Sequence, residues 1–356
     1  MEQTILAAEE KKIAQPDPSK IMQVGMGFWA SKVLLSAVQL KLFTILSGNS
    51  FSGKQIKEKL NLQTTQRHVY DWLDALVSLG FLQRDGVLDG AQYCNAADTD
   101  LFLDKNKPGY MGGILEMGNN RLYGFWNHLE EGLLTGQAQN ESRDGKNMNF
   151  FEDLYKSPEK LSEFVHAMSG IQIGNFMTLA RKFNFSNYQT LTDVGGANGS
   201  LSIQIALNHK NIHCTTFDLP PVEPLAKNKI AQFNLQDRIK AVGGDFMKDD
   251  LPKAEIIVMG NILHGLSEDA KQALVKKVFE TLPANGVLMT IENIIDNERR
   301  QNTFGLLMSL NMLIENGEAF DYTFNDFNRW AKHAGFRRTE LLPLAGPTSA
   351  AIAYKN

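Results

Sequence analysis

The chain is short of cysteine, of excess positive charge and of long apolar runs, and each shortage excludes a class of protein. Its 356 residues include only two cysteines, too few for a disulfide framework or a four-cysteine zinc site. Lys and Arg total 36 against 40 Asp and Glu, so the net charge is −4, whereas a dedicated nucleic-acid binder is usually basic. We therefore expect a cytoplasmic protein that binds no nucleic acid.

The sequence also shows none of the apolar segments that mark membrane-spanning and secreted proteins. No stretch reads as the continuous run of about 18 to 20 apolar residues that spans a bilayer, so we expect no membrane segment. The first residues mix acids and bases and do not form a signal peptide. We expect residues 1–20 to be a flexible tail. A hydrophobic content of 43% is ordinary for a globular protein, and the length suffices for two domains.

Residues 21–105 have the pattern of a winged helix. Apolar residues at helical spacing fill 21–46, a short helix is expected over 52–62, and a longer one over 64–82. A hairpin follows around the turn dipeptide Asp85-Gly86. The last helix exposes acids as well as bases, which disfavours a DNA-reading helix. We therefore expect a dimerisation module.

The rest of the chain divides into two regions with different sequence patterns. Residues 106–187 read as helical and are rich in aromatic residues and Met, which suits a linker that lines a pocket for a flat ligand. Residues 188–356 alternate apolar strands with helical segments. This alternation predicts an α/β fold with a mainly parallel, Rossmann-like sheet and helices on both faces.

A glycine-rich turn is the sharpest motif. In LTDVGGANGSLSIQIA, an apolar strand ends after Asp193, and Gly195, Gly196 and Gly199 lead into a helix. Glycines let the backbone approach a ligand closely. Asp218 follows 23 residues after Gly195, at the end of the second strand, where an acid accepts hydrogen bonds from a ribose diol. The pair fits an adenosine group, in either a nicotinamide cofactor or S-adenosylmethionine.

A third motif decides between those cofactors. GGDFM places Asp245 and Phe246 after a further strand, an acid for the adenine amino group and a ring to stack on the purine. The assembled pattern resembles the class I S-adenosylmethionine methyltransferases. DVGGANGS, FDLP, GGDFM, ILHGLSEDA, LPANGVLMTIE and DFNRWAKHAGF follow the order and spacing of the family that contains caffeic acid and acetylserotonin O-methyltransferases.

The resemblance covers nearly the whole chain and implies a function. It implies a seven-stranded methyltransferase sheet, S-adenosylmethionine as cofactor, a metal-independent reaction, an aromatic small-molecule acceptor such as a phenol or a polyketide, and a homodimer formed through the N-terminal domain. The residues that we expect to bind the cofactor are Asp193, Gly195, Gly196, Gly199, Asp218, Leu219, Gly244, Asp245, Phe246 and Asn261.

The candidate general base is His264. It lies just beyond the apolar strand AEIIVMGN, at the edge where open α/β sheets bind ligands, and histidine can take a phenol proton near neutral pH. On the residues alone, a structural histidine is the commoner case. The resemblance favours the base, because His264 falls on the histidine of the family's His-Asp-Trp segment. It also implies that Glu292 and Asp321 flank that histidine, although the family usually has Glu at the second position.

Substrate residues follow from the same resemblance, and so do two departures. Phe164 and Met168, and then Met312 and Asn316, match positions that line the cofactor and acceptor pocket. The residues after the histidine are Gly265 and Leu266 rather than Asp and Trp, and Gly260 replaces a Lys or Arg that commonly contacts the cofactor.

Three other functions remain open at this stage. The same scaffold could methylate nitrogen or carbon, or assist a reaction without methyl transfer. The chain could be a ligand sensor whose winged helix binds DNA. It could also be a nicotinamide dehydrogenase on a similar sheet.

Overall fold

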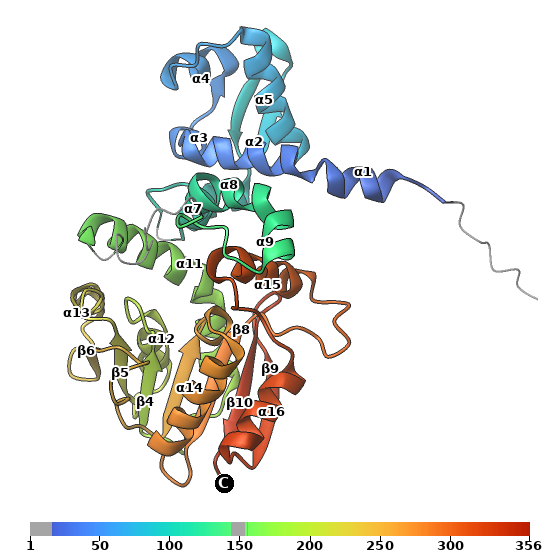
Figure 1. Cartoon of the computed structure of the whole chain (residues 1–356). Helices are drawn as coiled ribbons and strands as arrows, with labels where there is room; N and C mark the ends of the chain where they lie inside the picture. Colours follow the sequence, from blue (N-terminus) through green and yellow to red (C-terminus); the bar gives the residue numbers. More distant parts are fainter. Residues whose placement is uncertain (1–15, 108, 144–153, 155) are drawn as a thin grey trace, which may run out of the picture. The chain divides into compact units, whose positions relative to one another are not determined.

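The computed structural model describes residues 16–107, 109–143, 154 and 156–356 (Figure 1). Most of the predicted tail, residues 1–15, lies outside the described residues. The chain divides into two compact units, residues 1–105 and 106–356.

The N-terminal unit consists of short helices and a small sheet. Its helices are α1 (Ser19–Gly25), α2 (Gly27–Gln39), α3 (Leu42–Ile45), α4 (Gly53–Lys59), α5 (Gln66–Ser78) and α6 (Ala97–Phe102). Strands β1 (Phe51–Ser52), β2 (Leu82–Asp85) and β3 (Gln92–Asn95) pair antiparallel in the order β1-β3-β2. A 3-10 turn, η1 (Leu88–Gly90), joins β2 to β3. The predicted succession of helices and hairpin is confirmed, except that the segment 21–46 is three helices rather than one.

The expectation of no membrane segment meets one exception within the described residues, since one helical segment is long and apolar enough to cross a membrane by length and composition alone. Ser19–Gln39 has 21 residues, and its most apolar 18-residue window has a mean hydropathy of 1.3, with only 11% of that window buried. Glycines, serines and single lysines interrupt its run of large apolar residues, so a search for continuous runs passes over it. Ile21 and Val24 are each 74% exposed, and Trp29 is 60% exposed, so this face is unpartnered within the described part of the chain.

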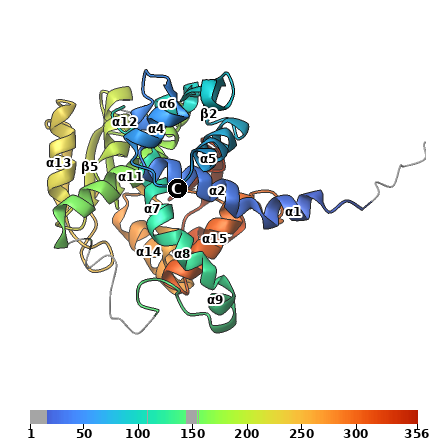
Figure 2. The same ribbon diagram turned by 90° about the horizontal axis from the view of Figure 1, so that it is seen from above.

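The second unit begins with helices. They are α7 (Gly112–Met117), the π-helical turn η2 (Gly118–Leu122), α8 (Tyr123–Phe125), the 3-10 turn η3 (Trp126–His128), α9 (Leu129–Thr135) and the long α11 (Pro158–Lys182). Helices α7, α8 and α9 follow one another in Figure 2, and α9 packs against α15 (Thr303–Asn316). Helix α11 begins where the Ser157 side chain accepts a hydrogen bond from Lys160 N and Pro158 occupies the first turn.

A seven-stranded sheet forms the rest of this unit. Its strands are β4 (Thr190–Val194), β5 (His213–Asp218), β6 (Ile239–Gly243), β7 (Ile256–Gly260), β8 (Val287–Glu292), β9 (Arg338–Pro343) and β10 (Ser349–Tyr354). The order is β6-β5-β4-β7-β8-β10-β9. The first five are parallel, and β10 is antiparallel to both β8 and β9. The alternation of strands and helices predicted for residues 188–356, and with it the Rossmann-like fold, is confirmed.

Alternation along the central strand builds two cores. Ile256 and Val258 of β7 pack on one face with α11, α12 (Ser200–Asn208) and α13 (Glu223–Gln232). Ile257 and Met259 pack on the other with α14 (Glu268–Thr281) and α16 (Phe324–Ala334). Because both faces are covered, β7 is apolar throughout. The carboxyl ends of five parallel strands therefore meet at one edge, where ligands bind in this fold class.

Candidate active site

The turn from β4 to α12 has three glycines at positions where a side chain would clash or would strain the backbone. Gly195 and Gly199 have φ of 69° and 76°, a left-handed conformation that favours glycine. A Cβ on Gly196 would lie 2.1 Å from Oγ1 of Thr216 and 2.8 Å from Oδ2 of Asp193. The three predicted glycines therefore form a bare backbone cradle at the edge of the sheet.

Asp218 ties this turn to the end of β5. Its Oδ2 accepts a hydrogen bond from Ala197 N at 2.8 Å, and its Oδ1 accepts one from Leu219 N at 2.7 Å. Burial raises the pKa of Asp218, and the two backbone N–H groups oppose this shift. Each carboxylate oxygen can accept a second hydrogen bond, so the group keeps acceptor capacity for a ligand hydroxyl.

Several polar atoms around the turn are buried without a hydrogen-bond partner among the described residues. They are Oδ2 of Asp193, Nδ2 of Asn198 and Oδ1 of Asn261. Burial, reinforced by the charge of Asp218, raises the pKa of Asp193 to about 7. Buried polar groups without a partner are rare and costly. These atoms are therefore suited to bind a polar ligand that would supply the missing hydrogen bonds.

The third motif lies beside the second. Gly244 N donates to Asp218 O at 2.8 Å, which brings the loop after β6 against the end of β5. The Asp245 carboxylate lies 3.0 Å from Nζ of Lys248, and that contact is the largest cause of its lowered pKa. Phe246 is partly buried against the core beneath α14. The structure thus brings the three predicted cofactor segments to one edge.

Helix α11 supplies a wall to this edge (Figure 1). Phe164 packs in a cluster with Ala197 and Leu219, and Ser169 Oγ donates to Asn198 Oδ1 at 2.8 Å. Met168, one turn beyond Phe164, is half-buried. Sequence reasoning identified Phe164 but missed Ser169 and Asn198, because a serine within a helix carries no signal of what faces it.

His264 lies on the 3-10 turn η4 (Leu263–Gly265), directly after β7. Oε1 of Glu292 accepts hydrogen bonds from the backbone N–H groups of Ile262, Leu263 and His264 at 3.1, 2.8 and 3.3 Å. Glu292, at the end of β8, therefore holds the backbone that carries the histidine. Burial raises the pKa of Glu292 to about 7, although the charge of His264 opposes this shift.

Asp321 approaches the histidine ring from the loop between α15 and α16. Its Oδ2 lies 3.5 Å from Nδ1 of His264, and the two side chains are 1% and 12% exposed. Burial would lower the pKa of His264, but the carboxylates of Asp321 and Glu292 outweigh it and raise that pKa. The three predicted catalytic residues are therefore neighbours, with Nε2 as the ring nitrogen turned away from Asp321.

The two predicted acceptor residues on α15 differ in exposure. Met312 is 8% exposed, whereas Asn316 is exposed at the carboxyl end of the helix. Helix α15 packs against η4, so it carries Met312 alongside the turn that bears His264. The structure does not bring Asn316 into the buried cluster.

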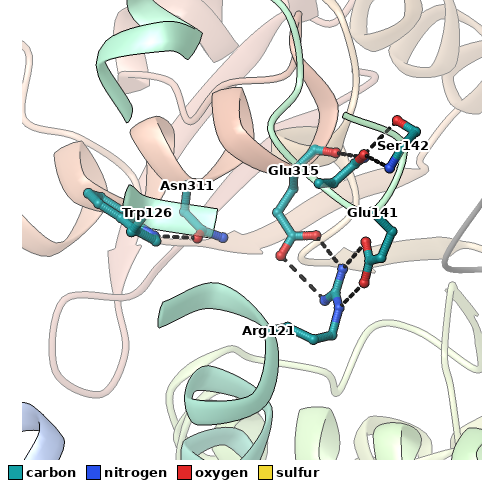
Figure 3. Close-up of polar contacts among 7 residues, drawn as sticks. Arg121, Trp126, Glu141, Ser142, Asn311 and Glu315 are labelled. Atoms are coloured by element: carbon teal, nitrogen blue, oxygen red, sulfur yellow. Dashed lines mark hydrogen bonds and ion pairs between the residues drawn. The ribbon is translucent and has the colours of Figure 1, made fainter. Parts of the chain in front are cut away.

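An arginine clamp holds α15 in place, and the sequence did not predict it. Nε and Nη2 of Arg121, on η2, donate to the two oxygens of Glu141 at 2.6 and 3.0 Å, and Nη2 also donates to Glu315 at 3.2 Å (Figure 3). Nearby, Trp126 Nε1 donates to Asn311 Oδ1 at 2.9 Å. These partners are up to 194 residues apart, so no local pattern reveals them.

Comparison with known proteins assigns the chain to a family. An O-methyltransferase domain model matches residues 126–337, more than half of the chain, and an O-methyltransferase dimerisation domain model matches residues 22–105. The chain belongs to the O-methyltransferase family. It is an S-adenosylmethionine-dependent O-methyltransferase with an N-terminal dimerisation domain. This decides against a nicotinamide dehydrogenase.

Full-length relatives support the assignment. The tetracenomycin polyketide synthesis 8-O-methyl transferase TcmO of Streptomyces glaucescens is 35% identical over 95% of this chain and 97% of its own length. Acetylserotonin O-methyltransferase of Gallus gallus is 28% identical over 91% of this chain and 93% of its own length. The crystal structure of human N-acetylserotonin methyltransferase in complex with SAM shares the fold, with a TM-score of 0.86, 24% identity, and coverage of 97% and 99%.

The two glycines that depart from the family pattern leave space. A Cβ on Gly260 would lie 3.8 Å from Phe176, and a Cβ on Gly265 would meet nothing within 4 Å. The missing side chains are therefore not replaced by others at these two positions. Among the described residues, no group of three or more His, Cys, Asp or Glu side chains is arranged to hold a metal ion.

Proposed function

We propose that this O-methyltransferase methylates a hydroxyl group of an aromatic small molecule, a phenol or polyketide-like compound, with His264 as the general base. The observation that carries the proposal is the position of His264. It follows the carboxyl end of a central parallel strand, Glu292 holds its backbone, and the Asp321 carboxylate lies 3.5 Å from Nδ1. This is the arrangement of a base whose ring is oriented and whose cationic form is stabilised.

The chemistry follows from the two ring nitrogens. Because Nδ1 faces a carboxylate, the proton of the neutral ring belongs there, and Nε2 carries the lone pair. Nε2 takes the proton of the acceptor hydroxyl, and the carboxylates of Asp321 and Glu292 stabilise the resulting imidazolium. The cofactor, when bound, supplies an electrophilic methyl group on a sulfonium. The reaction as proposed needs no metal ion.

The residues present suit that cofactor. The backbone of Gly195, Gly196 and Gly199 would receive its amino-acid portion, and the spare acceptor capacity of Asp218 suits ribose hydroxyls. Asp245 and Phe246 would contact the adenine. The remaining candidates, which would complete the pocket, are Asp193, Leu219, Gly244 and Asn261. The partnerless buried atoms of Asp193 and Asn261 support this fit.

An aromatic acceptor is supported by the relatives and by the wall residues. TcmO is named for the synthesis of a polyketide, and a 26% identical relative from Streptomyces sahachiroi is named as a 3-hydroxy-5-methyl-1-naphthoate 3-O-methyltransferase. The pocket would be lined by residues 106–187 and α15, with Phe164, Met168 and Met312 inside and Asn316 at its rim.

The enzyme is proposed to act as a cytoplasmic homodimer that binds no nucleic acid. The dimerisation domain match supports the homodimer. Cys94 and Cys214 are both free thiols, which fits a reducing compartment.

Amine acceptors are the second candidate. An N,N-dimethyltransferase of Streptomyces rimosus, OxyT, is 27% identical over 89% of this chain. An amine loses its proton after or during methylation, so the same base could serve both acceptor types.

The test measures S-adenosylhomocysteine by mass spectrometry, with S-adenosylmethionine and a panel of hydroxynaphthoates, N-acetylserotonin and matched aryl amines. We expect acceptor-dependent product with the phenols and a loss of at least ~100-fold in His264→Ala. His213→Ala is the control, because His213 is exposed at the start of β5. Undiminished turnover in His264→Ala would remove the base, and product with amines alone would favour the second candidate.

A further inference from the structure

A buried lysine stands beside the proposed catalytic cluster. Lys271, in the first turns of α14, is 0% exposed. Its Nζ donates to the carbonyl oxygen of Leu266, two residues after His264, and lies 3.5 Å from the centroid of the Phe320 ring, next to Asp321. A buried ammonium group is costly unless nearby charges compensate it, so the surrounding charges decide what this residue does.

Lys271 interacts electrostatically with five charged or titratable groups. One lies on its own helix, and the other four lie on four other segments of the chain. The five groups are Glu268 from α14, Glu292 from β8, Asp321 from the α15–α16 loop, Asp326 from α16, and His264 from η4. Tyr322, which is buried with its hydroxyl on Thr290, also lies near Glu292 and Asp321.

Two of the four acids already have another cation. Arg329 contacts Glu268 at 3.1 Å and Asp326 at 2.9 Å, and Asp326 also accepts hydrogen bonds from Thr323 in a capping box. Within the described residues, neither Glu292 nor Asp321 forms an ion pair with an arginine or a lysine, and the charges of both act on Lys271 without direct contact. Lys271 is therefore the cation that balances these two carboxylates.

The charges fall into a simple balance around the base. Once Glu292, whose pKa is raised to about 7, has lost its proton, the two carboxylates and Lys271 leave the cluster at −1 with a neutral imidazole and at zero with an imidazolium. Without the lysine those states become −2 and −1, and the imidazolium gains stability. We propose that Lys271 is a positioning residue for His264: its ammonium group offsets the two carboxylates and keeps the imidazole free to accept a proton at neutral pH.

Other observations support the inference, which rests on the proposed role of His264. The charge of Lys271 lowers the pKa of His264, opposite to the effect of Glu292 and Asp321. Burial lowers the pKa of Lys271 itself to about 8, so the lysine is mostly cationic at neutral pH. Its hydrogen bond to Leu266 also links α14 to the segment that carries the base.

The experiment is a histidine NMR titration of the whole protein without cofactor. Imidazole-labelled wild type is compared with Lys271→Gln, which keeps a donor for Leu266 but removes the charge, and with Lys271→Met. The His264 signal is assigned by its absence in His264→Gln. We expect its titration midpoint to rise by about one pH unit, a tenfold change in proton affinity. Lys271→Arg, which keeps the charge, should return the midpoint toward the wild-type value.

The matched control is Lys355→Met. Lys355 Nζ donates to the carbonyl oxygens of Phe279 and Leu282 and lies 4.5 Å from the Phe279 ring centroid. It makes the same kinds of contact as Lys271 but at the opposite end of α14. Its loss should leave the His264 midpoint unchanged. An equal shift in this control would show a general packing effect and overturn the proposal.

Turnover separates the two hypotheses. In Lys271→Gln the acid limb of the rate against pH should move to higher pH by the same amount as the NMR midpoint. An unchanged midpoint in folded Lys271→Gln and Lys271→Met overturns the lysine inference and leaves the base intact. Full turnover in His264→Ala instead overturns the base, whatever the midpoint does.

Discussion

At the scale of single residues, Gly196 is the glycine, among those described, at which an added Cβ would make the shortest contact. A Cβ there would lie 2.1 Å from Thr216 Oγ1, so Gly196→Ala must move the turn that would receive the cofactor. Overpacking typically costs about 1–3 kcal/mol. We therefore expect S-adenosylhomocysteine to bind at least ~tenfold more weakly, as measured by isothermal titration calorimetry.

A matched glycine makes that result specific. A Cβ on Gly90 would meet nothing within 4 Å, so Gly90→Ala should bind the product with wild-type affinity. Equal affinity in Gly196→Ala and the wild type would show that the turn is not part of the cofactor site.

The substitution Glu292→Gln should change how the reaction rate depends on pH. In Glu292→Gln the amide oxygen can still accept the backbone hydrogen bonds, but the negative charge that raises the pKa of His264 is lost. The acid limb of the rate against pH should therefore move to lower pH, opposite to the shift expected for Lys271→Gln. Steady-state kinetics between pH 5 and 9 measure it, and a shift to higher pH would contradict the charge balance.

Glu292 also predicts how stability depends on pH. Its folded pKa is raised from 4.5 to about 7, so the folded state retains a proton that the unfolded state releases, and stability falls as pH rises through this window. The pKa of His264 is also raised. Its contribution to stability therefore also falls as the pH rises through its folded pKa. Urea denaturation at pH 5 and pH 8 should show the wild type losing more than about 1 kcal/mol relative to Glu292→Gln.

Some residues of the candidate site could be predicted from local sequence motifs, and others could not. The glycine turn and Asp218 could be predicted because the spacing between them is that of one strand–turn–helix unit followed by a second strand. Lys271 could not, because a lysine on an amphipathic helix is by default solvent-exposed, and its burial depends on which loops cover α14. His264, Glu292 and Asp321 came from a family resemblance, and it is the fold that brings them together.

At the scale of secondary-structure elements, Arg121 joins η2, the loop containing Glu141 and the end of α15. Replacing it with Leu leaves two largely buried carboxylates without their cation, a loss that costs about 3–5 kcal/mol. We expect Arg121→Leu to lower the melting temperature clearly. Because α15 carries Met312, the KM for the acceptor should rise more than kcat falls.

The control for this clamp is a looser ion pair. Arg143 pairs with Glu131, and the two side chains are 33% and 47% exposed, so Arg143→Leu should cost less than about 1 kcal/mol. Similar melting temperatures for both variants would show that the clamp does not stabilise α15.

Elements were predicted more securely where their residues face a core. The central strands β7 and β8 were predicted because they are apolar runs whose residues are nearly all buried. The break in the helical segment 21–46 was not, because helical spacing persists across Lys41, whose φ of 58° breaks the helix. Its exposed apolar face gave no periodic contrast with which to locate the break.

At the scale of the whole molecule, the apolar face of Ser19–Gln39 has two readings. The dimerisation domain match begins at residue 22, which favours burial against a second copy. Trp29 is 60% exposed, so Trp29→Glu should convert dimer to monomer in light scattering. Leu134→Glu, at a residue 86% exposed outside that match, should leave the dimer intact.

The same segment could instead enter a lipid bilayer, since its length and hydropathy allow it. Flotation with phosphatidylcholine vesicles decides between these readings. We expect the protein to remain at the bottom of the gradient, because dimerisation would cover the apolar side chains. Flotation of the wild type but not of Trp29→Glu would assign the segment to a membrane.

The position of β10 has a consequence for biosynthesis. This strand follows β9 in the chain but lies between β8 and β9 in the sheet. On the ribosome, β8 therefore emerges well before the strand it must pair with, and its edge stays open until β10 has left the exit tunnel. An open edge is a template for aggregation. Slow codons between β9 and β10 should therefore lower the soluble yield of this enzyme more than the same codons placed before β4.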